Sequence, residues 1–236
     1  MMANLTYERL TVPGAQALAE WERLRTAGRG VPVVIGNDED LERLAKQFSV
    51  DDPEAFGVML ADIPPRSTAE VLTAAEGIRF PTDLQVWTGA RQQEDLDAPE
   101  GEWPSSLDAG GEGLSVATDI STQRFHNEVH ILLIPAQFSW ELPAYLKFGD
   151  FNECHPAEYH VAALRSWHDR FGAELVGINA DTLNVRSARC PEREEAIALA
   201  REQYAYCQDI VEQGFDSISA LAATLAANRW WGFWWD

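Results

Sequence analysis

Residues 230–236 read WWGFWWD, and this short stretch holds four of the nine tryptophans in the chain. Side chains alternate between the two faces of a β-strand, so a strand here would carry aromatic rings on both faces. Such a strand has to be covered on both sides, which predicts a central strand of the core. The alternative is an aromatic wall that contacts a ligand or a partner protein through Trp230, Trp231 and Trp234.

The elements before this tail predict what covers it. Residues 173–178 and 182–188 form a predicted hairpin around Asn179-Ala180-Asp181, because two apolar runs flank a turn sequence. Apolar residues at helical spacing, with prolines at the first turn, predict helices over 156–171 and 191–212, and a further helix is predicted over 216–227.

The first half of the chain alternates helices and strands. We predict helices over 14–26, from Asn37 or Asp38 through Phe48, over 53–62 and over 67–77, with Ser67 as the N-cap of the last. The predicted strands are 31–36, 83–88 and 127–134, while 139–152 is expected to be extended chain and turns.

Residues 90–113 break this pattern, because they are rich in acidic residues, proline and glycine. We interpret the second half of this stretch as a long surface loop. The expected organisation is an N-terminal α/β part over 1–113 and a C-terminal α+β unit over 114–236, joined in one continuous globule. The predicted fold class is α+β, with a mixed or mainly antiparallel sheet, helices on its faces and the Trp-rich strand in the core.

Charge narrows the classes of partner. Aspartate and glutamate number 38 against 18 lysines and arginines, which gives a net charge of −20. A surface of this sign repels phosphate backbones and anionic lipids, so we expect neither nucleic acid nor membrane as a partner. A basic protein is the electrostatically favoured partner.

The three cysteines, Cys154, Cys190 and Cys207, are widely spaced and form no CxxC pair. No apolar run approaches the roughly 20 residues that span a bilayer. The sequence therefore predicts a cytoplasmic protein with reduced thiols.

Several C-terminal motifs resemble those of one uncharacterised bacterial family, the domain of unknown function 4253. These motifs are LKFGDFNE at 146–153 followed by Cys154, the run YHVAALRSWHDRFGAELVGINADTL at 159–183, the run EEAIALAREQYAYCQDIVEQG, and the WWGFWWD tail. The resemblance is close over about 135–236 and looser for VPVVIGNDEDLERL. It implies that the last hundred residues fold as a unit, and it implies no reaction, substrate or cofactor.

All five histidines lie between positions 126 and 168, which is the main reason to look for a site there. On a strand, His126, Glu128 and His130 would face the same way, successive residues roughly 6.6 Å apart. Two imidazoles and a carboxylate are metal-ligand types, so this row is a candidate metal site. The alternative is a solvent-facing polar row.

A second constellation surrounds Cys154. With His155 or His160 as base, Cys154 is a candidate catalytic nucleophile, and a helix N-terminus beside it would lower the pKa of its thiol. The nearby carboxylates oppose a thiolate, and the simpler interpretation is a buried, inert cysteine. Further candidate binding residues in the same loop are Asp150, Asn152 and Glu153.

The sequence contains no GxSxG, GxxxxGK, GxGxxG or HExxH signature. The leading hypothesis is therefore a non-catalytic protein-binding or immunity-type module. The first alternative is an enzyme, hydrolase-like and thiol- or metal-dependent, with a site near Asp150–His160. The second is a small-molecule sensor that uses the aromatic tail. No cofactor is expected, with a divalent metal as the alternative.

Overall fold

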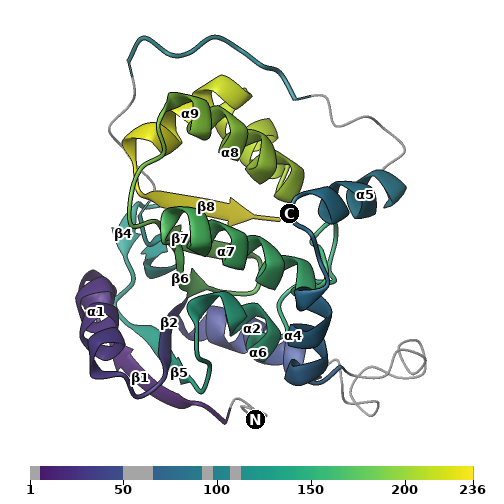
Figure 1. The fold of residues 1–236 in the computed structure, drawn as a ribbon. Helices are drawn as coiled ribbons and strands as arrows, with labels where there is room; N and C mark the ends of the chain where they lie inside the picture. Colours follow the sequence, from purple (N-terminus) through teal and green to yellow (C-terminus); the bar gives the residue numbers. More distant parts are fainter. Residues whose placement is uncertain (1–5, 50–65, 92–97, 107–112, 236) are drawn as a thin grey trace.

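A computed structural model describes residues 6–49, 66–91, 98–106 and 113–235. Its centre is a six-stranded sheet in the order β1-β5-β2-β6-β7-β8 (Figure 1). Strands β2 and β6 are parallel, and every other neighbouring pair is antiparallel. The strand bounds are Glu8–Val12 for β1, Val31–Gly36 for β2, Val129–Ile134 for β5, Glu174–Ile178 for β6, Thr182–Arg186 for β7 and Trp230–Trp234 for β8.

This architecture confirms the predicted α+β class and its mixed, mainly antiparallel sheet. The strands predicted at 31–36 and 127–134 and the hairpin at 173–188 form as expected, while β1 was not predicted. Strands from both halves of the chain pair with one another, since β5 lies between β1 and β2, and β2 pairs with β6.

Helices cover the two faces of the sheet unequally. Leu132 and Ile134 of β5 face the larger core, and Ile131 and Leu133 face a smaller one. Helix α1 lies over the smaller core, and most of the other helices pack on the larger one (Figure 1). The helix bounds are Ala17–Ala27 for α1, Asp38–Ser49 for α2, Thr68–Glu76 for α4, Thr82–Arg91 for α5, Leu142–Leu146 for α6, Ala157–Phe171 for α7, Arg193–Tyr206 for α8 and Ile218–Ala227 for α9.

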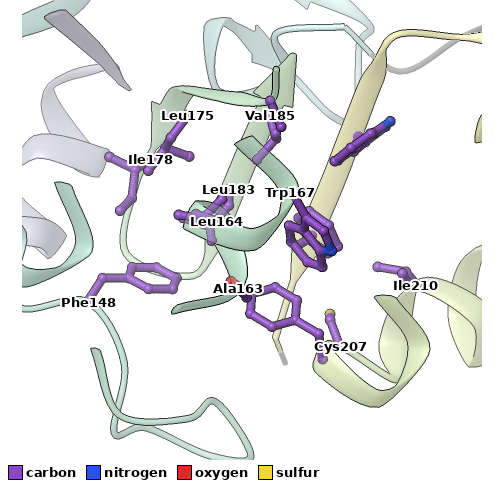
Figure 2. Packing of buried hydrophobic residues seen from close by; sticks show 14 of the residues in the cluster. Phe148, Ala163, Leu164, Trp167, Leu175, Ile178, Leu183, Val185, Cys207 and Ile210 are labelled. Carbon is purple, nitrogen blue, oxygen red and sulfur yellow. The ribbon is translucent and has the colours of Figure 1, made fainter. Parts of the chain in front are cut away.

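The Trp-rich strand β8 joins the sheet as predicted, but at its edge. The prediction of a central strand was therefore wrong. Figure 2 shows Trp167 of α7 beside this strand, and the ring of Phe233 stacks on Trp167 at 5.4 Å between centroids. On the other face, Trp230 is half-buried and lies 5.7 Å from the Arg186 guanidinium, which also covers Trp21. One cationic side chain thus shields the aromatic face that a second layer would otherwise cover.

Residues 83–88 are helical, so the strand predicted there was wrong. Leu84 and Thr88 are both buried, and their i, i+4 spacing places them on one side of α5. Asp83 accepts a hydrogen bond from the Arg79 backbone N–H at 2.8 Å at the start of the helix. A short run with valine, tryptophan and threonine fits either structure locally, and tertiary packing decides between them.

Two further boundaries differ from the predictions. Residues 139–152 contain a 3-10 turn, Ser139–Glu141, followed by α6, where extended chain was expected. The helix predicted over 191–212 ends at Tyr206, because Cys207 is extended and a π-helical turn follows over Ile210–Phe215. The Cys207 thiol donates to the Trp234 carbonyl at 2.9 Å, which ties this break to β8.

Part of the acidic stretch 90–113 is placed against the body of the protein. The Ile218 backbone N–H donates to the Pro99 carbonyl at 2.9 Å, and Arg201 pairs with Glu100 at 3.0 Å. Residues 98–106 therefore run along α8 and α9 (Figure 1). The helix predicted over 53–62 lies outside the described residues.

Candidate functional site

A polar surface hollow lies where β2 and β6 end. These two strands are parallel, so their carboxyl ends meet at the same edge of the sheet. The segment after β2 begins at Asn37 and the segment after β6 begins at Asn179, and between them lies a surface hollow of about 460 Å³. Crevices at the carboxyl ends of strands are a common place for ligands to bind.

Two neighbouring hollows extend this one. A hollow of about 400 Å³ shares Glu39 and His126 with it, and another of about 430 Å³ shares Arg43 and Asp181 with it. We call the three together the acidic hollow, because carboxylates dominate their charged lining and Arg43 is ion-paired with one of them. The carboxylates are Asp38, Glu39, Asp40, Asp119, Glu128 and Asp181.

The floor of the acidic hollow is held by a hydrogen-bond network. The Asn37 side-chain oxygen caps α2 by accepting from the backbone N–H groups of Glu39 and Asp40, at 2.8 and 3.1 Å. Asp40 in turn accepts from the Asn179 side chain at 3.1 Å, which links the ends of the two strands. Partial burial raises the pKa of Asp40. Gly36 has φ 113°, and a Cβ there would meet the Asp40 carboxylate, so this position needs glycine.

The structure places the predicted metal row beside the acidic hollow, but not as a strand face. Strand β5 begins at Val129, so the strand alternation assumed for the row does not extend to His126. The His130 ring is buried, 2.7 Å from Asp38 through Nε2 and 3.1 Å from the Thr11 hydroxyl through Nδ1. His126 and Glu128 line the hollow. In the described part of the chain, no group of three His, Cys, Asp or Glu residues is arranged to hold a metal ion.

The three candidate catalytic residues do come together, in the interior. Cys154, His155 and His160 are all buried, and Cys154 Sγ lies 3.3 Å from His160 Nε2. His160 Nε2 also lies 3.1 Å from the His155 carbonyl, and His160 Nδ1 lies 2.5 Å from the Tyr206 hydroxyl. Cys154 and Cys207 both belong to the larger core, where Figure 2 shows Cys207.

These contacts determine which ring nitrogen of His160 carries the proton. Burial holds the pKa of His160 well below its usual range, so the ring is neutral and carries one N–H. A carbonyl only accepts, so Nε2 donates to the His155 carbonyl and Nδ1 accepts from the Tyr206 hydroxyl. Nε2 therefore has no lone pair to take the Cys154 proton. Burial also raises the pKa of the Cys154 thiol, so the geometry does not favour a thiolate nucleophile.

His155 is the second buried imidazole of this cluster. Burial lowers its pKa to about 3, so it too is neutral. Neither ring nitrogen has a hydrogen-bond partner, and the ring lies among aromatic side chains. Trp87 meets it edge-on at 5.3 Å between centroids, Tyr206 at 5.0 Å, and Trp235 at 6.1 Å.

The candidate binding loop lies between this cluster and the acidic hollow. Asp150, Asn152 and Glu153 are exposed, and Asn152 lines the hollow together with Phe151 and Trp235. Asp150 and Asn152 have φ values of 61° and 46°, in the left-handed region that costs energy for residues other than glycine.

The aromatic tail contributes two consecutive side chains to the hollow, Trp234 at the end of β8 and Trp235 directly after it. Trp234 lines the hollow of about 460 Å³, and Trp235 lines the neighbouring one of about 430 Å³. Trp231 is buried in the core, and Trp230 packs against Arg186. Of the three tryptophans predicted as contacts, only Trp234 lies at the acidic hollow.

Sequence reasoning missed most of the acidic hollow. Two polar, acidic runs that each follow a buried strand indicated it: Asn37-Asp38-Glu39-Asp40 and the turn Asn179-Ala180-Asp181. It also missed a two-stranded hairpin, β3 over Thr118–Asp119 and β4 over Arg124–Phe125, that borders the hollow.

The fold and site together define an α+β domain with an acidic hollow at the carboxyl ends of two parallel strands. Residues 130–236 match the model of the family described as Domain of unknown function (DUF4253), which confirms the family resemblance predicted for the C-terminal motifs. No curated protein and no solved structure gives a significant match. Among the described residues, no helix has the length and apolar character needed to cross a membrane.

Proposed function

We propose that the chain is a non-catalytic protein-binding module whose acidic hollow receives a basic segment of another protein. The observation that carries this proposal is the lining of the hollow, with six carboxylates against Arg43, which is itself paired with Asp181. Arginine and lysine side chains form charge-assisted hydrogen bonds with carboxylates, so a basic segment is the best chemical match. Masking a basic protein, as an immunity-type module does, is the biological form of binding that this surface favours.

The charge of the whole chain supports the same partner. A net charge of −20 attracts a basic protein over a distance and speeds encounter, most strongly at low ionic strength. The Asn37–Asp40–Asn179 network holds part of the lining before a partner arrives. Fewer groups then need to be ordered on binding, which lowers its entropic cost.

A thiol enzyme is the second candidate function, because Cys154, His160 and Tyr206 form a continuous chain of contacts. Its test is alkylation of the native protein with iodoacetamide. We expect Cys190, which is half-buried, to react, and the buried Cys154 and Cys207 to react only after unfolding. Rapid alkylation of Cys154 in the folded protein would favour the enzyme and count against the binding proposal.

The test of the binding proposal uses a defined probe, a twelve-residue peptide of alternating arginine and leucine, with an alternating glutamate and leucine peptide as its counterpart. We expect the full chain to bind the Arg–Leu peptide and not the Glu–Leu peptide, with affinity that falls as salt is added. Fluorescence anisotropy of each labelled peptide measures its affinity and how that affinity depends on salt.

Charge reversal locates the binding. Glu39 and Glu128 are exposed at the acidic hollow, and the variant Glu39→Lys/Glu128→Lys is expected to weaken Arg–Leu binding at least about tenfold. Asp169→Lys/Glu194→Lys, a matched control, changes the net charge equally, and neither of its residues lines the hollow. Equal loss in both variants would show that binding follows net charge alone, and would refute a site at the hollow.

A further inference from the structure

We propose that the β3–β4 hairpin is the apolar anchor of this docking surface, so that the partner presents an apolar side chain beside its arginines or lysines. This inference rests on the proposed function. The hairpin carries Ile120 and Phe125, which are 79% and 59% exposed.

Few large apolar side chains in the described part of the chain are this exposed. Besides the two on the hairpin there are Val86, on α5, and Phe138. Phe138 stacks on Trp140 at 5.0 Å between ring centroids, so an intramolecular contact already uses one of its faces. Ile120 and Phe125 instead belong to a single small element, where exposed apolar surface indicates an interaction site.

The tip of the hairpin is held in one shape by its own hydrogen bonds. Asp119 Oδ1 accepts from the Ser121 hydroxyl at 2.6 Å and from the Thr122 backbone N–H at 2.9 Å. The Gln123 side chain donates to the Ile120 carbonyl at 2.8 Å, which closes the turn. A tip that is already ordered loses little conformational entropy when a partner covers it.

The base of the hairpin is fixed to the body of the protein. The Gly14 backbone N–H donates to the His126 carbonyl at 3.0 Å, and the His126 backbone N–H donates to the Ala117 carbonyl at 3.0 Å. A Cβ at Gly14 would lie 2.6 Å from the His126 carbonyl oxygen, so the two segments approach as closely as glycine permits. These backbone hydrogen bonds and this close packing hold the base of the hairpin at the side of the sheet.

The hairpin and the acidic hollow form one surface, to which Ile120 contributes directly and Phe125 as the cross-strand neighbour of Thr118, which also lines the hollow. Ile120 and Asp119 line the same hollow of about 460 Å³ as Glu39, Asp40 and Asp181. An apolar anchor surrounded by charged residues is the usual anatomy of a protein–protein contact, in which a few buried side chains contribute most of the affinity. The negative surroundings select a basic partner over a second copy of this chain, which carries the same charge of −20.

The test compares three serine substitutions that leave the charge unchanged. In the full chain, Ile120→Ser and Phe125→Ser are each expected to weaken binding of the Arg–Leu peptide at least about tenfold. Val86→Ser, the matched control, removes an apolar side chain that is 68% exposed on α5, and is expected to leave binding within about twofold. A peptide of alternating arginine and serine is expected to bind the wild-type chain at least about tenfold more weakly than the Arg–Leu peptide.

The outcomes separate this inference from the proposed function. If the Arg–Ser and Arg–Leu peptides bind equally, and the hairpin variants match Val86→Ser, the hollow binds basic segments without an apolar anchor and this inference fails alone. If neither peptide binds, both proposals fail. If sedimentation shows a dimer that Phe125→Ser dissociates, the hairpin contacts a second copy, which would also overturn this inference.

Discussion

Tyr206 and His160 show how one hydrogen bond decides the chemistry of the buried cluster. Because the Tyr206 hydroxyl donates to Nδ1, the proton of the neutral imidazole sits on Nε2, where it faces the His155 carbonyl and the Cys154 sulfur. Residue types alone suggested a cysteine and a base, and the structure does bring them together. Which ring nitrogen of His160 carries the proton depends on the His155 carbonyl and on Tyr206, a tyrosine 46 positions later in the chain. No local pattern in the sequence reveals these two contacts.

Removing the Tyr206 hydroxyl leaves a buried acceptor without its donor. We expect Tyr206→Phe to lower the free energy of unfolding by about 1–3 kcal/mol, measured by urea denaturation at pH 7. Tyr145→Phe is the matched control, because the Tyr145 hydroxyl donates to the Pro135 carbonyl at an exposed position where water can replace it. A smaller loss for Tyr206→Phe than for Tyr145→Phe would contradict the proton assignment.

The two buried histidines also predict a pH dependence of stability. Both are neutral when folded, with the pKa of His155 lowered to about 3, whereas in the unfolded chain they titrate near 6.5. Between these values the unfolded state binds more protons, so stability falls as the pH is lowered from about 6.5, by up to about 1.4 kcal/mol per pH unit for each histidine.

Urea denaturation at pH 7 and pH 5 measures this effect, and His155→Phe removes one of the two titrating groups. We expect the variant to lose less stability than the wild type between the two pH values. Hydrogen bonds lower the pKa values of the Asp119 and Glu195 carboxylates to about 2. The stability that these two carboxylates contribute is therefore lost mainly at lower pH. An unchanged pH dependence in the variant would contradict a buried, neutral His155.

Among the elements, β8 joins the sheet to α7 and α8. Its buried residues meet Trp167 and Tyr206, and the thiol of Cys207 donates to its backbone at Trp234. The aromatic content of the stretch was sufficient to predict a strand. Its edge position was not predictable from an aromatic pattern on both faces, because Arg186 covers Trp230 on one of them without a further strand pairing beyond β8.

Alanine substitutions in β8 test whether the two faces of this strand are covered unequally. Phe233 is fully buried, and Phe233→Ala is expected to destabilise the protein by about 3–5 kcal/mol. Trp230→Ala, on the half-buried face of the same strand, is expected to cost less than half as much, although it removes the larger side chain. Thermal unfolding of both variants at one pH measures the difference. Equal losses would mean that β8 is covered equally on its two faces.

Other elements show where local patterns fail. The stretch that became α5 has the composition of a strand, and only the burial of Leu84 and Thr88 one helical turn apart reveals its structure. The end of α8 was placed too late, because the apolar spacing continues through Cys207, whereas the backbone leaves the helix there and the Cys207 thiol donates to the Trp234 carbonyl. In both cases contacts distant in sequence outweighed local spacing.

At the scale of the whole molecule, charge is the most informative property of the sequence. Net charge alone favours a basic partner, and the fold adds a hollow in which acidic residues from four separate segments gather. That gathering was not predictable, because Asp40, Asp119 and Asp181 lie far apart in sequence. Pairing of β2 with β6 brings the segments of Asp40 and Asp181 to the same edge of the sheet.

Mapping by NMR is the sharpest test of whether a basic segment binds in the acidic hollow and against the hairpin. Isotope-labelled full-length protein is titrated with the Arg–Leu peptide, and the backbone amide shifts are followed. We predict that the largest changes fall on residues 37–43, 118–126 and 179–182, and that they shrink as salt is added. Changes spread evenly over the acidic surface, or centred on α8 and α9, would show that the peptide does not bind at the hollow and the hairpin.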